Sequence, residues 1–363
     1  MNATQRLHAL GQSLWIDNIS RGLLKDGTLS GYIRDLGITG LTSNPTIFDP
    51  AITHTNDYDE AIRSKARTGL SGEALFFELA LEDLAQAADL FRPIHDATGG
   101  VDGWVSLEVS PVLANDTAAT IRAAAQLHAR AQRPNLYIKI PGTPAGLPAI
   151  EESIYAGVPV NVTLLFSREQ YLAAAEAYLR GIERRLAAGR DPRVSCLASL
   201  FVSRWDVAVK DKVPQRLRNQ LGIGIALRTY RAYRELLAAA RWQKLAGSGA
   251  RPQRLLWAST GTKDPGAPDV LYVEALAAPD TINTLPDKTL LAYADHGTVK
   301  EAMPLDGGRA ETILAEFAGQ GVDVQALASD LQREGTAAFA ESWRSLLAGI
   351  AAKSAAMTQA KSA

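Results

Sequence analysis

The chain has 363 residues, of which 47% are hydrophobic and 21% are charged, and its formal net charge is −1 at pH 7. A net charge so close to zero argues against nucleic acid and anionic membranes as partners, and no apolar run is long enough for a transmembrane helix or a signal core. The single cysteine, Cys196, excludes an internal disulfide and favours a reducing compartment. We expect a cytoplasmic protein of enzyme size, either one large barrel or two ordinary domains.

Eight apolar segments, taken in chain order, have the composition and length of strands. Some alternate between apolar and polar residues, and others are apolar throughout, as buried parallel strands are. The eighth is short and weak. The expected strands cover residues 14–18, 38–42, 103–109, 136–140, 158–166, 194–201, 254–259 and 281–284.

Helical segments separate these strands, with apolar residues spaced three or four apart. A short helix precedes the first strand, and a polar connection is expected over residues 21–28. In the last helix we expect Phe339 and Trp343, which lie four residues apart, to form a packing stripe rather than contact a ligand. The clearest other helices are expected over residues 29–36, 58–67, 72–91, 117–131 and 148–156.

Alternation of strands and helices, without a low-complexity linker, predicts a parallel α/β fold. No glycine-rich phosphate loop follows a strand, which argues against a doubly wound nucleotide-binding sheet. Polar residues stand at the carboxyl ends of several strands, and a closed barrel brings those ends to one rim. We therefore predict a single (β/α)8 TIM barrel domain over residues 1–363, with additional helices and a C-terminal helical segment (about 309–352) packing on the barrel.

Lys139 stands near the end of an apolar strand, in the run L-Y-I-K-I-P-G-T that starts at Leu136. Burial disfavours the ammonium form and lowers a lysine's pKa. A neutral ε-amine attacks a ketone or aldehyde and forms a Schiff base. The plain alternative is a lysine at the strand end whose charged head reaches water.

The polar strand ends carry motifs of a known family. They are L-W-I-D-N around Asp17, T-S-N-P-T-I-F from Thr42, S-L-E-V around Glu108, L-Y-I-K-I-P-G-T around Lys139, N-V-T-L-L-F-S from Asn161 and S-L-F-V-S-R from Ser199 to Arg204. In this order, over roughly residues 10–350, the chain resembles the transaldolase family and its longer bacterial branch. The resemblance implies transfer of a dihydroxyacetone unit from sedoheptulose 7-phosphate to glyceraldehyde 3-phosphate, in the non-oxidative pentose phosphate pathway.

The same resemblance implies three catalytic residues. Lys139 forms the Schiff base with C2 of the ketose phosphate, and the protonated imine accepts the electron pair released when C3–C4 breaks, so neither a metal nor an organic cofactor is expected. Glu108 acts through a bound water on the carbinolamine oxygen, and Asp17 removes the proton of the C4 hydroxyl. The alternative for Glu108 is an ion pair with Lys139 and no role in proton transfer.

Sugar phosphates are the expected partners, and short polar residues are expected to bind the donor hydroxyls: Thr42, Asn44, Asn161, Thr163 and Ser199. A phosphate dianion needs fixed cations or amide donors. We expect Arg204 in this role. Ser259 matches a phosphate-contact position of the family, and Lys263, in a loop where other members carry an arginine, is expected to take the place of that arginine.

Two other functions remain open at this point. A simple aldolase would use the same lysine and release dihydroxyacetone to water, and a non-catalytic barrel would only bind sugar phosphates. The two carboxylates beside a lysine in an apolar strand argue against the second. The length of the chain and its long C-terminal helix, as a lid, favour transfer over release.

Overall fold

The computed structural model describes residues 2–299 and 301–359. Within them, eight parallel strands pair in chain order, and β1 pairs with β8, so the sheet closes into a barrel. The closed barrel confirms the predicted TIM-barrel architecture and excludes the open sheet. The strands are β1 (Ser13–Ile16), β2 (Gly40–Leu41), β3 (Trp104–Glu108), β4 (Leu136–Pro141), β5 (Val160–Leu165), β6 (Cys196–Phe201), β7 (Gln253–Ala258) and β8 (Thr281–Leu285).

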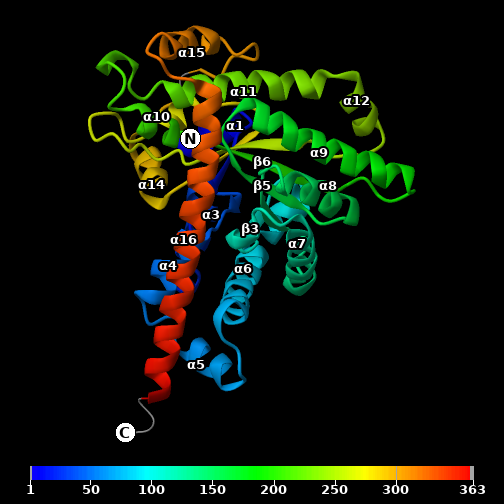
Figure 1. The fold of residues 1–363 in the computed structure, drawn as a ribbon, viewed down its shortest axis with the longest axis vertical. Coiled ribbons are helices and arrows are strands. Elements are labelled where there is room, and N and C mark those ends of the chain that lie inside the picture. Colours follow the sequence, from blue (N-terminus) through cyan, green and yellow to red (C-terminus); the bar gives the residue numbers. More distant parts are fainter. Residues whose placement is uncertain (1, 300, 360–363) are drawn as a thin grey trace.

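Helices surround the barrel and connect its strands (Figure 1). Before β3 they are α1 (Ala3–Ala9), α2 (Arg21–Lys25), α3 (Thr28–Leu36), α4 (Pro45–Thr53), α5 (Asp59–Arg67) and α6 (Gly72–Ala97). Between β3 and β7 they are η1 (Pro111–Leu113), α7 (Thr117–Ala131), α8 (Gly146–Ala156), α9 (Arg168–Ala187), α10 (Ser203–Val209), η2 (Gln215–Leu217), α11 (Leu221–Ala238) and α12 (Ala240–Gly247). The last are α13 (Leu271–Ala275), α14 (Asp287–His296), α15 (Ala310–Ala318) and α16 (Val324–Gln359).

Two expectations about the helices were wrong in detail. The segment 21–28 was expected to be a polar connection, but it holds α2, because the Ser20 side chain accepts a hydrogen bond from Leu23 N–H and caps a short helix there. The C-terminal segment was expected to run over about 309–352. It comprises α15 and α16, and α16 continues to Gln359.

Side chains of alternate strand residues fill the barrel interior. A layer of aromatic rings lies toward the end where the strands begin, where Tyr137 stacks on Trp104 with ring centroids 4.2 Å apart and lies 6.4 Å from Trp15. Lys139 stands two residues beyond Tyr137 on the same strand, so strand periodicity directs both side chains to the same face. The aromatic layer therefore forms a floor beneath the polar strand ends.

Gly40 in β2 leaves room for the ring of Trp15. A Cβ atom at this position would lie 2.3 Å from Cε2 of Trp15, which is fully buried. The Trp15 indole occupies the space that a side chain on β2 would need, so the aromatic floor depends on the absence of one.

The helix α16, of 36 residues, runs along most of the molecule, from the side of α15 to that of α5 (Figure 1). It contacts α4, α5 and α6 and also reaches β5 and η1. Gln332 on α16 donates hydrogen bonds from Nε2 to the carbonyl oxygens of Gly142 (3.0 Å) and Leu164 (2.9 Å), which follow β4 and lie in β5. Across residues 2–299 and 301–359, none of the helices has both the length and the apolar content of a membrane span.

Candidate active site

Lys139 lies in β4 and is buried. Its Nζ donates a hydrogen bond to the carbonyl oxygen of Ser43, 3.1 Å away, and lies 3.5 Å from Oε2 of Glu108. Glu108 reaches this position because β3 and β4 pair with Glu108 opposite Lys139. The register of two parallel strands therefore brings the candidate nucleophile and a carboxylate together.

Glu108 is a buried carboxylate with few partners. Apart from the approach of Lys139, neither of its oxygens has a hydrogen-bond partner among the residues that the structure describes. Burial raises the pKa of Glu108 to about 7, although the neighbouring Lys139 ammonium opposes this shift. A carboxyl with a pKa near neutrality can both donate and accept a proton at cellular pH.

Asp17 directly follows β1, and its side chain is partly exposed. The Thr42 hydroxyl lies 2.6 Å from Oδ1 of Asp17 and 2.7 Å from the Thr284 hydroxyl. Burial raises the pKa of Asp17, and the charge on Lys139 and the Thr42 hydrogen bond offset this rise only in part. The charge on Lys139 thus acts on the pKa of both Asp17 and Glu108. Asp17 follows β1 and Glu108 ends β3, the two strands on either side of β2.

A cavity of about 320 Å³ opens at this end of the barrel. Nine of the predicted site residues line it: Asp17, Thr42, Asn44, Lys139, Thr163, Ser199, Arg204, Ser259 and Lys263. The closed barrel brings these residues together although they stand up to about 250 positions apart in the chain. Two predicted residues, Glu108 and Asn161, are not part of the cavity wall and lie buried beside it.

The residues predicted to bind the donor hydroxyls differ in the hydrogen bonds that their side chains already make within the protein. Asn161 accepts a hydrogen bond from Ser199 (2.7 Å) and donates one to Ser106 (3.2 Å), so its side chain links β5 to β6 and β3. Asn44 caps α4, since its Oδ1 accepts from Ile47 N–H, and its amide group remains for a ligand. The buried Thr163 hydroxyl has no hydrogen-bond partner within the described part of the chain and lines the cavity.

The cationic part of the cavity wall lies at the start of α10 and in the loop after β7. Arg204 is the second residue of α10 and is half-buried, and burial lowers the pKa of its guanidinium. Ser259 holds φ at 56°, and its hydroxyl lies 3.0 Å from that of Ser203. Lys263 is exposed and lines the same cavity. These are the cations and the hydroxyl that the sequence predicted for phosphate binding.

Several lining residues were missed by the sequence analysis. Phe201 follows Ser199 by two residues in β6, so strand periodicity was a signal that both face the cavity. Phe339 was expected to form part of a packing stripe, and it is buried in the core, but it also lines the cavity from α16. No local signal marks Phe339, since only the path of α16 over the barrel brings it there.

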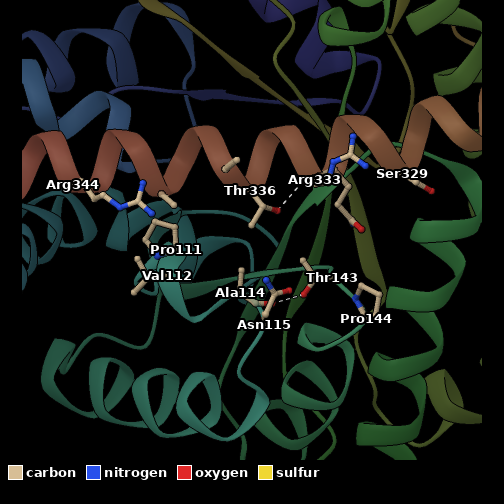
Figure 2. A pocket seen from close by; sticks show the side chains of 13 residues that line it. Pro111, Val112, Ala114, Asn115, Thr143, Pro144, Ser329, Arg333, Thr336 and Arg344 are labelled. Atoms are coloured by element: carbon tan, nitrogen blue, oxygen red, sulfur yellow. Dashed lines mark hydrogen bonds between the residues drawn. The ribbon is translucent and has the colours of Figure 1, made fainter.

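Another hollow, of about 480 Å³, lies between α16 and the loops after β3 and β4 (Figure 2). Arg333 and Arg344 border it, but each pairs with a carboxylate on its own helix, Asp330 and Glu341 respectively. Within residues 2–299 and 301–359, no group of three or more histidine, cysteine or acidic side chains is placed to hold a metal ion.

Comparison with known proteins agrees with this geometry. The model of the transaldolase/fructose-6-phosphate aldolase family matches residues 14–350. The chain belongs to this family. The transaldolase of Thiobacillus denitrificans is 44% identical over 96% of this chain and 100% of its own length, and that of Parafrankia sp. is 44% identical over 94% and 95%. The transaldolase of Neisseria gonorrhoeae is 42% identical, again over 96% of this chain and all of its own length.

Membership of the transaldolase/fructose-6-phosphate aldolase family confirms the resemblance that the sequence motifs indicated. The family name covers both transfer and simple aldol cleavage. The relatives that match nearly the full length of the chain at 42–44% identity carry the name transaldolase, which favours transfer.

Proposed function

We propose that this protein is a transaldolase that carries a dihydroxyacetone unit on Lys139 between two sugar phosphates. The observation that supports it most directly is the Lys139 amine, 3.5 Å from Glu108 and lining one cavity with Asp17. The donor would be sedoheptulose 7-phosphate and the acceptor glyceraldehyde 3-phosphate, with erythrose 4-phosphate and fructose 6-phosphate as products.

The first half of the reaction forms and uses an imine. Lys139 Nζ attacks C2 of the ketose, and the carbinolamine loses its oxygen as water after Glu108, through a bound water, supplies a proton. Asp17 then removes the proton from the C4 hydroxyl. The C3–C4 bond breaks, its electron pair moves into the protonated imine to give an enamine, and the aldose phosphate leaves.

The second half reverses these steps on another aldehyde. The enamine carbon attacks C1 of the acceptor, Asp17 returns its proton to the new hydroxyl, and hydrolysis of the imine releases the product ketose. The hydroxyl and amide groups of Asn44, Thr163 and Ser199 hold the donor chain, and Arg204, Ser259 and Lys263 bind the phosphate.

Borohydride trapping tests the proposal. The protein is incubated with fructose 6-phosphate, reduced and digested, and the peptide mass should show a sugar-derived adduct on Lys139. Lys139→Arg should fold and form no adduct, because a guanidinium stays protonated and makes no imine. An adduct on another lysine, or turnover by Lys139→Arg, would contradict the assignment. Release of free dihydroxyacetone without acceptor, at a rate matching transfer, would indicate an aldolase instead.

A further inference from the structure

Arg204 has an unusual environment for a half-buried cation. Its Cζ lies 5.3 Å from the ring centroid of Phe201 and 5.8 Å from that of Phe339. No carboxylate lies within ion-pair distance of it among residues 2–299 and 301–359, and burial lowers the pKa of its guanidinium. Two aromatic rings, and no counter-charge, surround this guanidinium.

One of these rings comes from a distant part of the chain. Phe339 lies on α16, and Gly335 precedes it by one helical turn. A Cβ atom on Gly335 would lie 3.5 Å from Nη1 of Arg204 and 3.0 Å from Cδ2 of Leu164. The guanidinium of Arg204 therefore lies next to α16 at Gly335, and Phe339 of the same helix lines the cavity that Arg204 also lines.

This arrangement suits a site that must bind an anion. A free arginine side chain samples many rotamers, and ordering it opposes binding. Aromatic faces attract a guanidinium without neutralising its charge or using up its N–H donors. A carboxylate partner would order Arg204 equally well, but it would compete with a phosphate for the same donors.

We propose that Phe339 is a positioning residue for the phosphate site. Together with Phe201, its ring holds Arg204 ready for the phosphate group of the sugar and so sets the preference for phosphorylated over non-phosphorylated substrates. The proposal rests on the proposed function, because it assumes that the cavity binds sugar phosphates.

The main test replaces the ring and retains its apolar character. Phe339→Leu should raise KM for fructose 6-phosphate roughly three- to tenfold, the range expected for one partly desolvated cation–π contact. Its kcat should change little, because the phosphate does not change charge in the reaction. The kcat/KM for fructose should stay at the parent value. Phe339→Tyr retains the aromatic face and should behave as the parent.

A double-mutant cycle shows whether Phe339 acts through Arg204. Adding Phe339→Leu to Arg204→Ala should raise KM for fructose 6-phosphate no further than Arg204→Ala does alone. Trp343→Leu is the matched control: it removes a buried ring one turn further along α16, which packs on Phe76 and Phe77. This variant should lower stability and leave the ratio of kcat/KM for the two sugars unchanged.

Failure of this proposal is distinguishable from failure of the proposed function. If borohydride trapping shows no sugar adduct on Lys139 of the parent, the proposed function is wrong and the inference falls with it. If the adduct forms, three results would overturn the inference alone: an equal loss on both sugars in Phe339→Leu, additive effects with Arg204→Ala, or a loss of phosphate preference in Trp343→Leu.

Discussion

Lys139 and Glu108 form a buried pair, and the chemistry of this pair depends on whether Glu108 is protonated. The carboxyl has a pKa raised to about 7 by burial, so at neutral pH it is divided between its acid and base forms. The acid form is the one that dehydration of the carbinolamine needs. We therefore propose Glu108 for the imine-forming step and Asp17, beside Thr42, for the C4 hydroxyl.

The first prediction concerns Glu108→Gln, which removes this proton. Loss of a general acid slows a reaction by about 100-fold or more. Because the acid form of Glu108 is lost as pH rises through about 7, the ratio of parent to variant rates should fall from about pH 6 to about pH 8. The measurement is the rate of appearance of the reducible adduct on Lys139. A ratio independent of pH would show that Glu108 only pairs with the lysine.

The second prediction concerns Arg204→Ala, which removes the half-buried cation of the cavity. A charge-assisted hydrogen bond contributes on the order of 1.5–3 kcal/mol, so KM for fructose 6-phosphate should rise roughly ten- to hundredfold with kcat nearly unchanged. Fructose, without a phosphate, should be used as well as by the parent. The control is Arg193→Ala, since Arg193 is an exposed arginine that pairs with Asp191. A similar loss on both sugars would place the phosphate elsewhere.

At the scale of single elements, α16 and β5 support each other. Leu164 in β5 has φ of 59°, which is strained for a non-glycine residue and costs on the order of 1–3 kcal/mol. The strand pairing of β5 with β6 is irregular between Val162 and Leu165. Gln332 of α16 binds the Leu164 carbonyl, so the helix stabilises the strained strand end next to Thr163.

The third prediction is that Gln332→Ala loosens this contact. Losing the side chain leaves the Gly142 and Leu164 carbonyl oxygens without their donor, and the free energy of unfolding should fall by about 1–2 kcal/mol. Urea unfolding measures this, and faster amide exchange in α16 should accompany it. Gln325→Ala, on an exposed face of the same helix, should stay within about 0.5 kcal/mol of the parent. Equal effects of both substitutions would contradict the prediction.

At the scale of the whole molecule, the two ends of the barrel have different tasks. Asp102 lies just before β3, at the end where the strands begin, and is buried. It accepts hydrogen bonds from the Ser13 hydroxyl, from Trp15 Nε1 (2.8 Å), from the Thr39 hydroxyl (2.8 Å) and from Gly103 N–H (3.1 Å). One carboxylate therefore joins the start of β1 to the approaches to β2 and β3, far along the strands from the catalytic rim.

The fourth prediction separates stability from activity. Asp102→Ala leaves several buried donors without an acceptor, and the free energy of unfolding should fall by about 3–5 kcal/mol. At a temperature where the variant stays folded, kcat and KM for fructose 6-phosphate should match the parent. Asp191→Ala, which removes an exposed carboxylate, is the control and should alter neither. A change in KM without a loss of stability would mean that the ends of the barrel are coupled.

The sequence alone determined the parallel barrel, the lysine and half of the residues that line the cavity. Strand periodicity can be recognised from neighbouring residues in the sequence. In a parallel barrel the carboxyl end of each strand reaches the same rim. The residues around a polar strand end are therefore enough to predict that it lies at this rim. Asp17, Lys139 and Ser199 were found in this way, whereas Thr42 and Thr163 were found through the motifs shared with the family.

Only the tertiary structure decided which groups face these residues. The opposition of Glu108 to Lys139 follows from strand register, and the raised pKa of Glu108 follows from the number of atoms packed around it. The position of Phe339 against Arg204 follows from the path of α16 across the barrel. A helical stripe shows which residues are buried but not what they are buried against, because that depends on the orientation in which the whole helix docks.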